Sequence, residues 1–327
     1  MFRFIGRSKY PRKIDINSQL NGFYGQHRSG WPYVLSLLKT LHCPGGILLD
    51  TFIERTFCWH PDGIKPNLRP WIGFIHVPPG IPKWFQYQQS NEFIFNSPAW
   101  KQSYPHCLGL FALSAYHQRD LQNRLDIPIE RFYFPTEIPK ITWNWERFKH
   151  NRDRKIIQIG WWLRKLHSIY RLPSPEYHKI FLRVTHADLD PLLARERTDL
   201  IAAGLFKDEW YHTAETLSYL PNKHYDRLLS ENLVFLDLYD SSANNTVIEC
   251  MVRHTPILIN PLESVKEYLG QDYPLYFNDL GEAATKACDL DLIYRAHLYL
   301  KENPIQYRLS RRSFLDTITQ SRIYQNL

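Results

Sequence analysis

Short apolar runs recur along the chain, and each is followed by glycine or polar residues and then by a helix-like segment. These runs are 47–50, 71–77, 108–114, 155–160, 233–238 and 256–260. Apolar runs of this length, bounded by turn residues and alternating with helices, are typical of strands in βαβ units. The strands of such units are parallel and are buried on both faces. The sequence therefore predicts an α/β protein with mostly parallel sheets.

The alternation occurs twice, which indicates two domains. The chain has 327 residues, 44% of them hydrophobic, which is enough for two separate cores. Between the two series, residues 135–154 are rich first in proline and then in charge, and we expect them to form the linker between the domains. We expect two Rossmann-like domains facing a central cleft, one over residues 1–145 and one over residues 146–300. Residues 301–327 are expected to form a C-terminal helix that packs back on the body.

The overall charge is basic. The formal net charge is +7 and the isoelectric point is near 9.0, which favours anionic partners such as nucleotides, phospholipid surfaces or nucleic acid. The basic cluster at residues 7–13 has no aromatic–basic repeat and no helix-turn-helix or zinc-finger pattern after it, so we expect no nucleic-acid partner. The apolar stripe of the last helix fits packing on a domain, which we favour, or peripheral association with a membrane. No feature indicates an oligomeric state.

The cysteines and the chain start bear on compartment and metal binding. Five cysteines are scattered along the chain without a Cys-x-x-Cys pair, so we expect neither a disulfide framework nor a zinc site. The N-terminus has no apolar signal region, and no window approaches the roughly 20 apolar residues that span a membrane. We therefore expect a cytoplasmic protein.

The stretch 240–260 lies between two of the expected strands and carries the strongest ligand-binding signal. Asn244 and Asn245 stand where its helix would begin. The first turn of a helix has unpaired backbone N–H groups and a positive dipole end, which favour an anion. Glu249, one turn further along, is placed to accept hydrogen bonds from hydroxyls. This combination fits a nucleotide diphosphate and its ribose.

A second anion-binding feature follows the strand that ends at Gly160. Arg164 and Lys165 come just beyond this strand end. An arginine guanidinium binds phosphate as a planar fork, and a lysine ammonium binds it as a point charge. The alternative is a solvated basic pair, but the preceding strand and glycine favour phosphate binding.

The first half of the chain carries a glycine-containing loop before an apolar helix-like run. Gly25, His27, Arg28 and Ser29 of this loop are candidates for contacting a ligand. Glycines let a backbone approach a ligand closely, and Ser29 or the loop amides lie at the expected helix start. An ordinary turn before a core helix fits this feature equally well.

Two strand ends in the first half carry candidate catalytic groups. Asp50 ends the run at 47–50, and His76 lies near the end of the run at 71–77. In open parallel sheets, ligands gather at the carboxyl ends of the strands. A single strand-end histidine is more often packed or hydrogen-bonded in the protein, and that alternative stays open for His76.

Several well-known sites have no sequence match. The chain lacks Gly-x-Gly-x-x-Gly and the Walker loop, which argues against dinucleotide redox chemistry and nucleoside triphosphate hydrolysis. It also lacks His-Glu-x-x-His and Gly-x-Ser-x-Gly, the signatures of zinc proteases and of α/β-hydrolases. We expect no metal and no cofactor.

The second half resembles the donor-binding domain of GT-B-fold glycosyltransferases of group 1, the glycogen-synthase-like superfamily. The resemblance covers residues 155–160, 217–222 and 240–259, and its most specific part is Asn245-Thr-Val-Ile-Glu249 followed by Pro256 and an apolar strand. The first half resembles the acceptor domain of this family more weakly, through its glycine loop, His76 and the strand–helix junction at 113–114.

The resemblance assigns roles to individual residues of the second half. Glu249 matches the acidic residue that binds the nucleotide ribose. The other matched donor-binding positions are Gly160, Arg164, Lys165, Leu220, Ser241, Asn244, Asn245 and Thr246. The chain departs from the family pattern at two places: Ser241 stands where a second acidic residue is usual, and Trp161 follows Gly160 where arginine is common.

The resemblance implies transfer of a sugar from a nucleotide diphosphate sugar to an acceptor, without a metal and with retention of configuration. The glycine loop would contact the acceptor, and His76 would line the reacting centre. An inverting mechanism would require a general base, for which Asp50 and His76 are the candidates. Two alternatives remain: a nucleotide-sugar epimerase, and a GT-B-like binding protein without catalytic activity.

Overall fold

The chain folds into two compact units. The computed structural model describes residues 10–16, 30–183 and 186–327, with only the backbone of Tyr211. Unit 1 takes its described residues from Met1–Pro79, Gln86–Glu137 and Tyr307–Leu327, and unit 2 consists of Gly80–Phe85 and Ile138–Gln306. Each unit contains a parallel sheet covered by helices, so the prediction of two Rossmann-like α/β units is confirmed.

The chain leaves unit 1 after Glu137, earlier than the expected boundary after residue 145. Trp143, expected in the linker, is buried in unit 2, where its backbone N–H donates to Arg253 O at 2.8 Å and its Nε1 donates to Asn232 O at 2.9 Å. Trp143 therefore belongs to the start of unit 2 and not to a linker, because burying a Trp ring removes a large apolar area from water.

The C-terminal segment that belongs to unit 1 begins at Tyr307, later than the expected start at residue 301. Thr136 N–H donates to Leu309 O at 2.9 Å, and the Phe314 ring lies 5.3 Å from that of Phe132. Phe314 and Ile318 are both buried inside unit 1. The apolar face of this helix is therefore used in packing and is not exposed for a membrane surface.

Unit 1 is built on a five-stranded parallel sheet in the order β1-β2-β3-β4-β5. Every residue of its central strand β3 is buried, as expected for a strand covered on both faces. The strands are β1 (Ile14–Asp15), β2 (Ile47–Asp50), β3 (Trp71–Ile75), β4 (Cys107–Ala112) and β5 (Ile129–Arg131).

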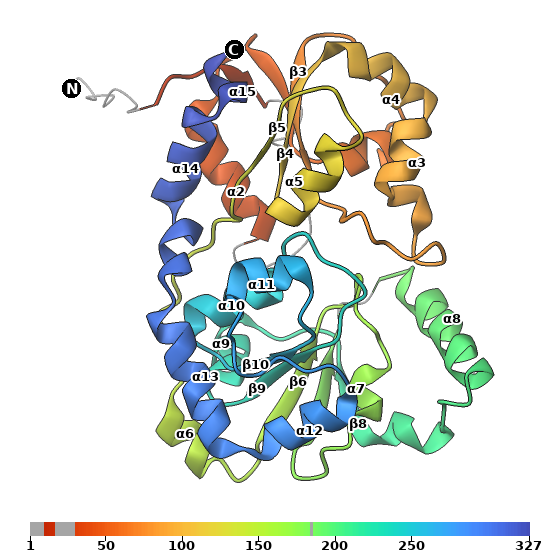
Figure 1. Ribbon diagram of the computed structural model, residues 1–327, viewed down its shortest axis with the longest axis vertical. Coiled ribbons are helices and arrows are strands. Elements are labelled where there is room, and N and C mark those ends of the chain that lie inside the picture. Colours follow the sequence, from red (N-terminus) through yellow and green to blue (C-terminus); the bar gives the residue numbers. More distant parts are fainter. Residues whose placement is uncertain (1–9, 17–29, 184–185) are drawn as a thin grey trace. The chain divides into compact units, whose positions relative to one another are not determined.

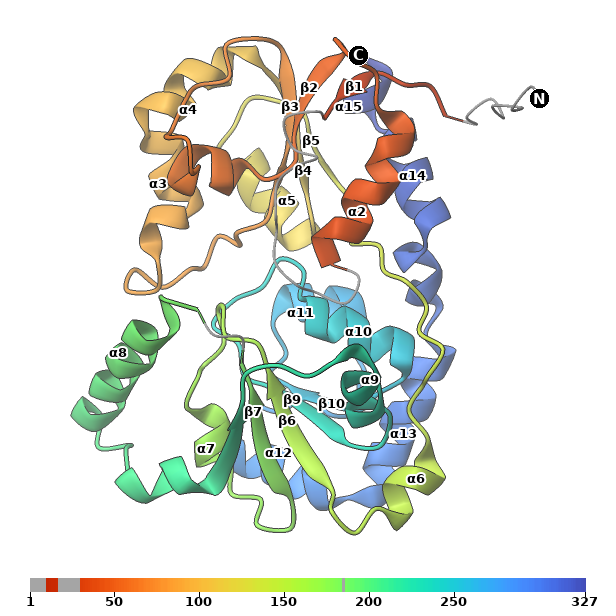
Figure 2. The same ribbon diagram turned by 180° about the vertical axis from the view of Figure 1, so that it is seen from behind.

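The helices of unit 1 cover both faces of this sheet. In Figures 1 and 2, α3 and α4 lie on one side of the sheet, and α2 and α14 lie together on the other. The helices are α2 (Gly30–Leu38), α3 (Asn91–Asn96), α4 (Pro98–Ser103), α5 (Ala115–Gln122), α14 (Arg311–Gln320) and α15 (Arg322–Gln325). The α3, α4 and α5 helices begin at the serines Ser90, Ser97 and Ser114, whose hydroxyls accept a hydrogen bond from the first helical turn.

Unit 2 is built on a second five-stranded parallel sheet, in the order β10-β9-β6-β7-β8. All residues of β9 and β10 are buried, in agreement with their continuous apolar sequence. The strands are β6 (Lys155–Ile159), β7 (His178–Leu182), β8 (Ala214–Leu217), β9 (Leu233–Leu236) and β10 (Ile257–Ile259).

The helices of unit 2 flank this sheet, and α10 packs against α9, α11 and α13 (Figures 1 and 2). They are α6 (Trp145–His150), α7 (Ser168–Arg171), α8 (Leu189–Ala202), α9 (Asn222–Ser230), α10 (Asn245–Arg253), α11 (Glu263–Leu269), α12 (Leu280–Cys288) and α13 (Leu290–Glu302). Across the described parts of both units, no helix has the length and apolar character needed to cross a membrane.

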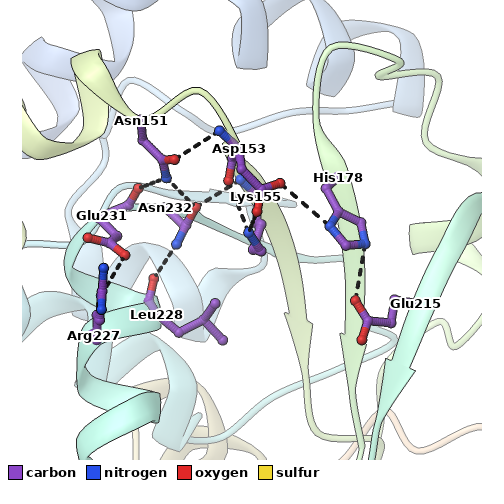
Figure 3. Close-up of polar contacts among 9 residues, drawn as sticks. All are labelled: Asn151, Asp153, Lys155, His178, Glu215, Arg227, Leu228, Glu231 and Asn232. Atoms are coloured by element: carbon purple, nitrogen blue, oxygen red, sulfur yellow. Dashed lines mark hydrogen bonds and ion pairs between the residues drawn. The ribbon is translucent and has the colours of Figure 1, made fainter.

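The edge of the second sheet at which its strands begin, the amino edge, carries a network of paired polar groups (Figure 3). Asn232 Oδ1 accepts the backbone N–H of Lys155 at 2.8 Å. The Lys155 ammonium pairs with Asp153. His178 lies between Asp153 and Glu215, 3.7 Å and 3.2 Å from their carboxylate oxygens. These contacts join the starts of β6, β7 and β9 to β8.

Candidate functional site

The opposite edge of the second sheet, at which the strands end, is the carboxyl edge. The chain leaves β6 there through Gly160, whose φ of +77° is a conformation that favours glycine. Gly160 N–H donates to Leu182 O at the end of the neighbouring strand β7, at 2.9 Å. A side chain at this position would meet the Arg164 guanidinium, since a Cβ atom would lie 3.3 Å from Nη2. Gly160 therefore lets the chain turn tightly and lets Arg164 fold back over the strand end.

Arg164 folds back against neutral oxygen atoms. Its Nε donates to Ile159 O at 3.2 Å, and its Nη1 donates to Trp162 O at 2.6 Å. Its Nη2 lies 3.4 Å from both Asn244 Oδ1 and Thr246 Oγ1, which is long for a hydrogen bond. The structure thus brings Arg164 to two other predicted site residues, Asn244 and Thr246, which lie 80 and 82 residues further along the sequence.

The charge of Arg164 has no anionic partner in the described part of the chain. The side chain is half-buried, and no Asp or Glu among the described residues forms an ion pair with it. Desolvation lowers the pKa of this guanidinium to about 10, so it remains a cation at neutral pH. A partly desolvated cation held only by neutral oxygens is suited to binding an anion.

Helix α10 begins where it was predicted, and its N-cap is Asn244. Asn244 Oδ1 accepts the backbone N–H groups of Thr246 at 3.0 Å and of Val247 at 3.3 Å. Two of the first-turn N–H groups that were expected to be unpaired therefore have a partner, because an asparagine N-cap accepts them. Asn245 is partly exposed at the same helix start. The positive dipole end and the Thr246 hydroxyl remain beside Arg164.

Lys165 and Arg164 are neighbours in sequence but have different surroundings. Lys165 Nζ pairs with Asp237 Oδ1 at 2.8 Å, and Ser168 Oγ donates to the other oxygen of Asp237 at 2.8 Å. The Lys165 side chain is 41% exposed, whereas that of Asp237 is 9% exposed. Of the two cations expected to bind phosphate, Lys165 therefore has a carboxylate partner, whereas Arg164 has none among the described residues. Sequence reasoning did not single out Asp237, although it directly follows β9.

Asp240 and Ser241, the position where the family usually has an acidic residue, are both buried. Asp240 Oδ2 accepts the backbone N–H of Gly80 at 2.6 Å, and its Oδ1 accepts that of Ser241 at 2.7 Å. A Cβ atom at position 80 would lie 2.6 Å from Asp240 Oδ2, so this approach requires glycine. The Asp240 carboxylate thus holds the segment Gly80–Phe85 within unit 2.

Glu249 lies on α10 with its side chain turned into the protein. Its Oε2 accepts the Tyr225 hydroxyl at 2.8 Å and lies 3.4 Å from Arg253 Nη1. Arg253 in turn pairs with Asp226 at 2.9 Å. The predicted ribose ligand is therefore part of a buried ion-pair network. The spacing of four residues between Glu249 and Arg253 gave a local signal for this pair, but the contact with Tyr225 is tertiary.

Leu220 is half-exposed in the loop between β8 and α9. The acceptor-loop candidates Gly25, His27, Arg28 and Ser29 lie outside the described residues.

In unit 1, Asp50 ends β2 and is 1% exposed. Its Oδ1 accepts the Phe52 N–H and its Oδ2 accepts Asn67 Nδ2, both at 3.2 Å. Burial raises the pKa of Asp50, and hydrogen bonds from Thr56, Phe52 and Asn67 oppose this shift. Both carboxylate oxygens thus already have partners inside unit 1.

His76 follows β3, and its surroundings differ from those of Asp50. Its Nδ1 lies 3.3 Å from Glu54 Oε2, whereas its Nε2 is buried and has no hydrogen-bond partner among the described residues. Sequence reasoning missed Glu54, which is fully buried. The only sequence signal was a charged residue inside the apolar stretch that follows β2.

A small cavity of about 280 Å³ lies beside Lys165 in unit 2. Its walls include Trp84, Arg171, Glu196 and Tyr239. Acidic and basic groups both line it, so it does not select an anion. In the part of the chain that the structure describes, no three His, Cys, Asp or Glu side chains are grouped to hold a metal ion.

No family model and no curated protein matches the sequence. Solved structures do match the fold. The α,α-trehalose-phosphate synthase of Burkholderia vietnamiensis has 12% sequence identity and a TM-score of 0.56, over 90% of this chain and 78% of that one. The trehalose-6-phosphate protein of E. coli bound with UDP-2-fluoro glucose has 13% identity and a TM-score of 0.54, over 91% of this chain and 80% of that one.

A third match is a TarM variant of S. aureus in complex with fondaparinux, α-GlcNAc-glycerol and UDP. It has 15% identity and a TM-score of 0.56, over 78% of this chain and 50% of TarM. These neighbours are GT-B glycosyltransferases. At such low identities, the likeness shows the fold. The chain therefore has the two Rossmann-like units of GT-B proteins, as predicted, and the central cleft stays a prediction.

Proposed function

We propose that this protein is a glycosyltransferase that moves a sugar from a nucleotide diphosphate sugar to an acceptor. The GT-B fold supports this reaction class, and two structural neighbours were solved with UDP or a UDP-sugar analogue. Unit 2 would bind the donor, since it carries the cationic site at the ends of its strands.

The observation that carries the proposal is Arg164. It is a half-buried cation, held by neutral oxygens, beside the N-terminal end of a nine-residue helix. The two long contacts of Nη2 can be exchanged for short, charge-assisted bonds to phosphate oxygens. A diphosphate would supply the negative charge that the described residues do not.

In the transfer step, the bond between the sugar and the diphosphate breaks, and negative charge develops on the departing diphosphate. Arg164 would stabilise this charge from a fixed position, with the α10 dipole and Lys165 adding to it. We assign this work to protein cations and not to a metal. Gly160 shapes the turn, and Ser241, Asn244, Asn245, Thr246 and Leu220 would border the donor, with Glu249 placed near its ribose.

We propose transfer with retention, which requires no dedicated base. A structural neighbour, trehalose-6-phosphate synthase, was studied for glycosyl transfer with retention. Asp50 has both oxygens engaged, so it is the weaker candidate base for an inverting reaction. His76, whose buried Nε2 has no hydrogen-bond partner among the described residues, is the better placed group in unit 1 to contact the acceptor.

A transfer assay tests the proposal. Purified protein is incubated with UDP-glucose, UDP-GlcNAc or GDP-mannose and with a library of sugars, sugar phosphates and polyols. Mass spectrometry detects glycosylated products, and NMR of the product gives its anomeric configuration. We expect product with one donor and loss of that product in Arg164→Met. Donor epimerised without any acceptor would favour a nucleotide-sugar epimerase instead.

A second candidate is a GT-B-like protein that binds nucleotide sugars without transferring them. It is favoured by Ser241 at the position of the usual acidic residue and by the internal pairing of Glu249 with Tyr225 and Arg253. This candidate predicts saturable binding of a nucleotide diphosphate, with no product in the same library and no hydrolysis. Transfer to any acceptor excludes it.

A further inference from the structure

In unit 1, the carboxylate of Glu54 gathers three N–H groups around the end of β3. Its Oε1 accepts the backbone N–H groups of His76 at 2.6 Å and of Val77 at 2.7 Å. Its Oε2 faces His76 Nδ1 at 3.3 Å. Glu54 is 0% exposed, so these contacts are formed away from water. One carboxylate therefore fixes both the backbone and the side chain of His76.

The imidazole ring of His76 is also held by two aromatic rings. Phe52 stacks on it with ring centroids 4.0 Å apart and an interplanar angle of 12°. Trp31 meets it edge-on at 4.5 Å and 84°. The stack fixes the plane of the ring, and a half-turn within that plane would lose the contact between Nδ1 and Glu54. Its orientation is thus set by the fold before any substrate binds.

The partner of Nδ1 determines the protonation pattern of the ring. Burial opposes ionisation of Glu54, but its hydrogen bonds with His76 and Val77 outweigh burial and lower its pKa. An ionised carboxylate can only accept hydrogen bonds, so Nδ1 must carry the proton. In the neutral ring, Nε2 then keeps its lone pair. This nitrogen is buried, and no described group donates to it, so it is an acceptor without a partner.

We propose that Glu54 is a positioning residue that fixes the Nδ1–H tautomer of His76, so that Nε2 accepts a hydrogen bond from a hydroxyl of the bound sugar acceptor. This inference rests on the proposed function, because it requires a hydroxyl-bearing substrate at unit 1. The role of Glu54 is to act through His76, without touching the substrate.

Glu54→Gln changes one atom and tests the tautomer directly. The glutamine oxygen can keep both backbone N–H groups at the place of Oε1, which puts its NH₂ group against His76 Nδ1. An NH₂ group donates, so Nδ1 must become the acceptor and the proton must move to Nε2. The fold is retained while Nε2 changes from hydrogen-bond acceptor to donor.

Long-range ¹H–¹⁵N NMR spectra of the full chain labelled with ¹⁵N-histidine report this change. The His76 signal is assigned by its loss in His76→Gln. We expect the Nδ1–H pattern in the wild type and the Nε2–H pattern in Glu54→Gln. An Nε2–H pattern in the wild type, or an unchanged pattern in the variant, overturns the proposal. The wild-type spectrum alone decides the tautomer if the variant does not fold.

Unit 2 offers a matched control. Glu196 Oε2 accepts both the backbone N–H of His167 at 2.9 Å and its Nδ1 at 2.7 Å. Glu196→Gln should therefore alter the His167 signal and leave the His76 signal unchanged. If it shifts the His76 signal as well, the change in Glu54→Gln is not local and the proposal fails.

Kinetics test the role in transfer. We expect Glu54→Gln to lower kcat by about tenfold, the loss of one hydrogen bond at the substrate, with donor KM within about twofold. His76→Gln should lower kcat by the same factor, and the double variant should lose no more. An unchanged kcat in folded Glu54→Gln overturns the proposal. If the wild type transfers no sugar, the proposed function fails together with the substrate role of His76, whereas the spectra still report whether Glu54 fixes the tautomer.

Discussion

The two edges of the second sheet hold their charged groups in opposite ways. At the amino edge, Lys155 pairs with Asp153, and His178 lies between Asp153 and Glu215 (Figure 3). At the carboxyl edge, the hydrogen bonds of Arg164 to the described residues all go to the neutral oxygens of carbonyl, amide and hydroxyl groups. The amino edge therefore satisfies its own charges, and the carboxyl edge leaves one cation for an external anion.

This difference separates residues that stabilise the fold from residues that prepare a site. A charge that is paired inside the protein stabilises the folded chain and does not contribute to ligand binding. A desolvated charge without a counter-ion costs the free protein some stability and becomes favourable when an anion binds. Substitutions at the two edges should thus separate stability from binding.

The largest expected effect is at Arg164. Arg164→Met should weaken binding of UDP by about 30-fold or more, because truncating one partner of a desolvated charge pair costs roughly 2–5 kcal/mol. The unfolding free energy should be unchanged or slightly higher, since a cation without a counter-ion is replaced by an apolar side chain. Calorimetric titration and urea unfolding measure the two quantities. A large loss of stability would place Arg164 with the structural residues.

At the amino edge, Asn232→Ala should reduce stability and leave UDP binding unchanged. The Asn232 side chain accepts the Lys155 N–H and donates to Leu228 O at 2.9 Å, and it is 2% exposed. Removing it leaves buried groups unpaired, so urea unfolding should show a loss of about 1–3 kcal/mol. UDP affinity should stay within about twofold of the wild type. Weaker UDP binding in the folded variant would contradict the division between the edges.

A substitution of Lys165 should affect both UDP binding and stability. Its exposed end can reach a ligand, but it also neutralises Asp237. Lys165→Met should weaken UDP binding by about threefold and reduce the unfolding free energy by less than about 1 kcal/mol, as for other solvent-exposed pairs. The same titration and unfolding series measure both. A binding loss as large as that of Arg164→Met would show that Lys165 is the main diphosphate ligand.

The smallest expected effect concerns acid stability at the amino edge. The hydrogen bond from Lys155, with the charges of Lys155 and His178, lowers the pKa of Asp153 below its usual value of 3.8. A carboxylate with a lowered folded pKa contributes stability that is fully present above its usual value and is lost as the pH falls through the folded value. Thermal unfolding should therefore show a small deficit in Asp153→Asn at pH 7 that disappears near about pH 2–3. A deficit that persists in acid would exclude the charge as its cause.

The fold was largely predictable because its signals are local. Apolar runs bounded by glycine and polar residues gave β2, β3, β4, β6, β9 and β10, and Asn244 marked the start of α10. The domain boundary was less predictable, since the burial of Trp143 depends on contacts with Asn232 and Arg253 far along the chain.

The candidate site was predictable only in part. The sequence placed Gly160, Arg164, Asn244 and Thr246 at the same edge of a sheet, where the structure brings them together. It did not show that Lys165 has a carboxylate partner or that Asn244 caps the Thr246 amide. These outcomes depend on side-chain directions, and Asp237 comes from a different strand. The same holds for Glu54, whose role depends on the fold around His76.

The central claim is that Arg164 binds the diphosphate of the donor. Calorimetric titration of the wild type and of Arg164→Met, each with UDP and with uridine, tests it most directly. We predict that the wild type binds UDP at least about tenfold more tightly than uridine and that this gap closes in the variant. Equal affinity of the wild type for the two ligands, or a gap that persists without the guanidinium, would contradict the account.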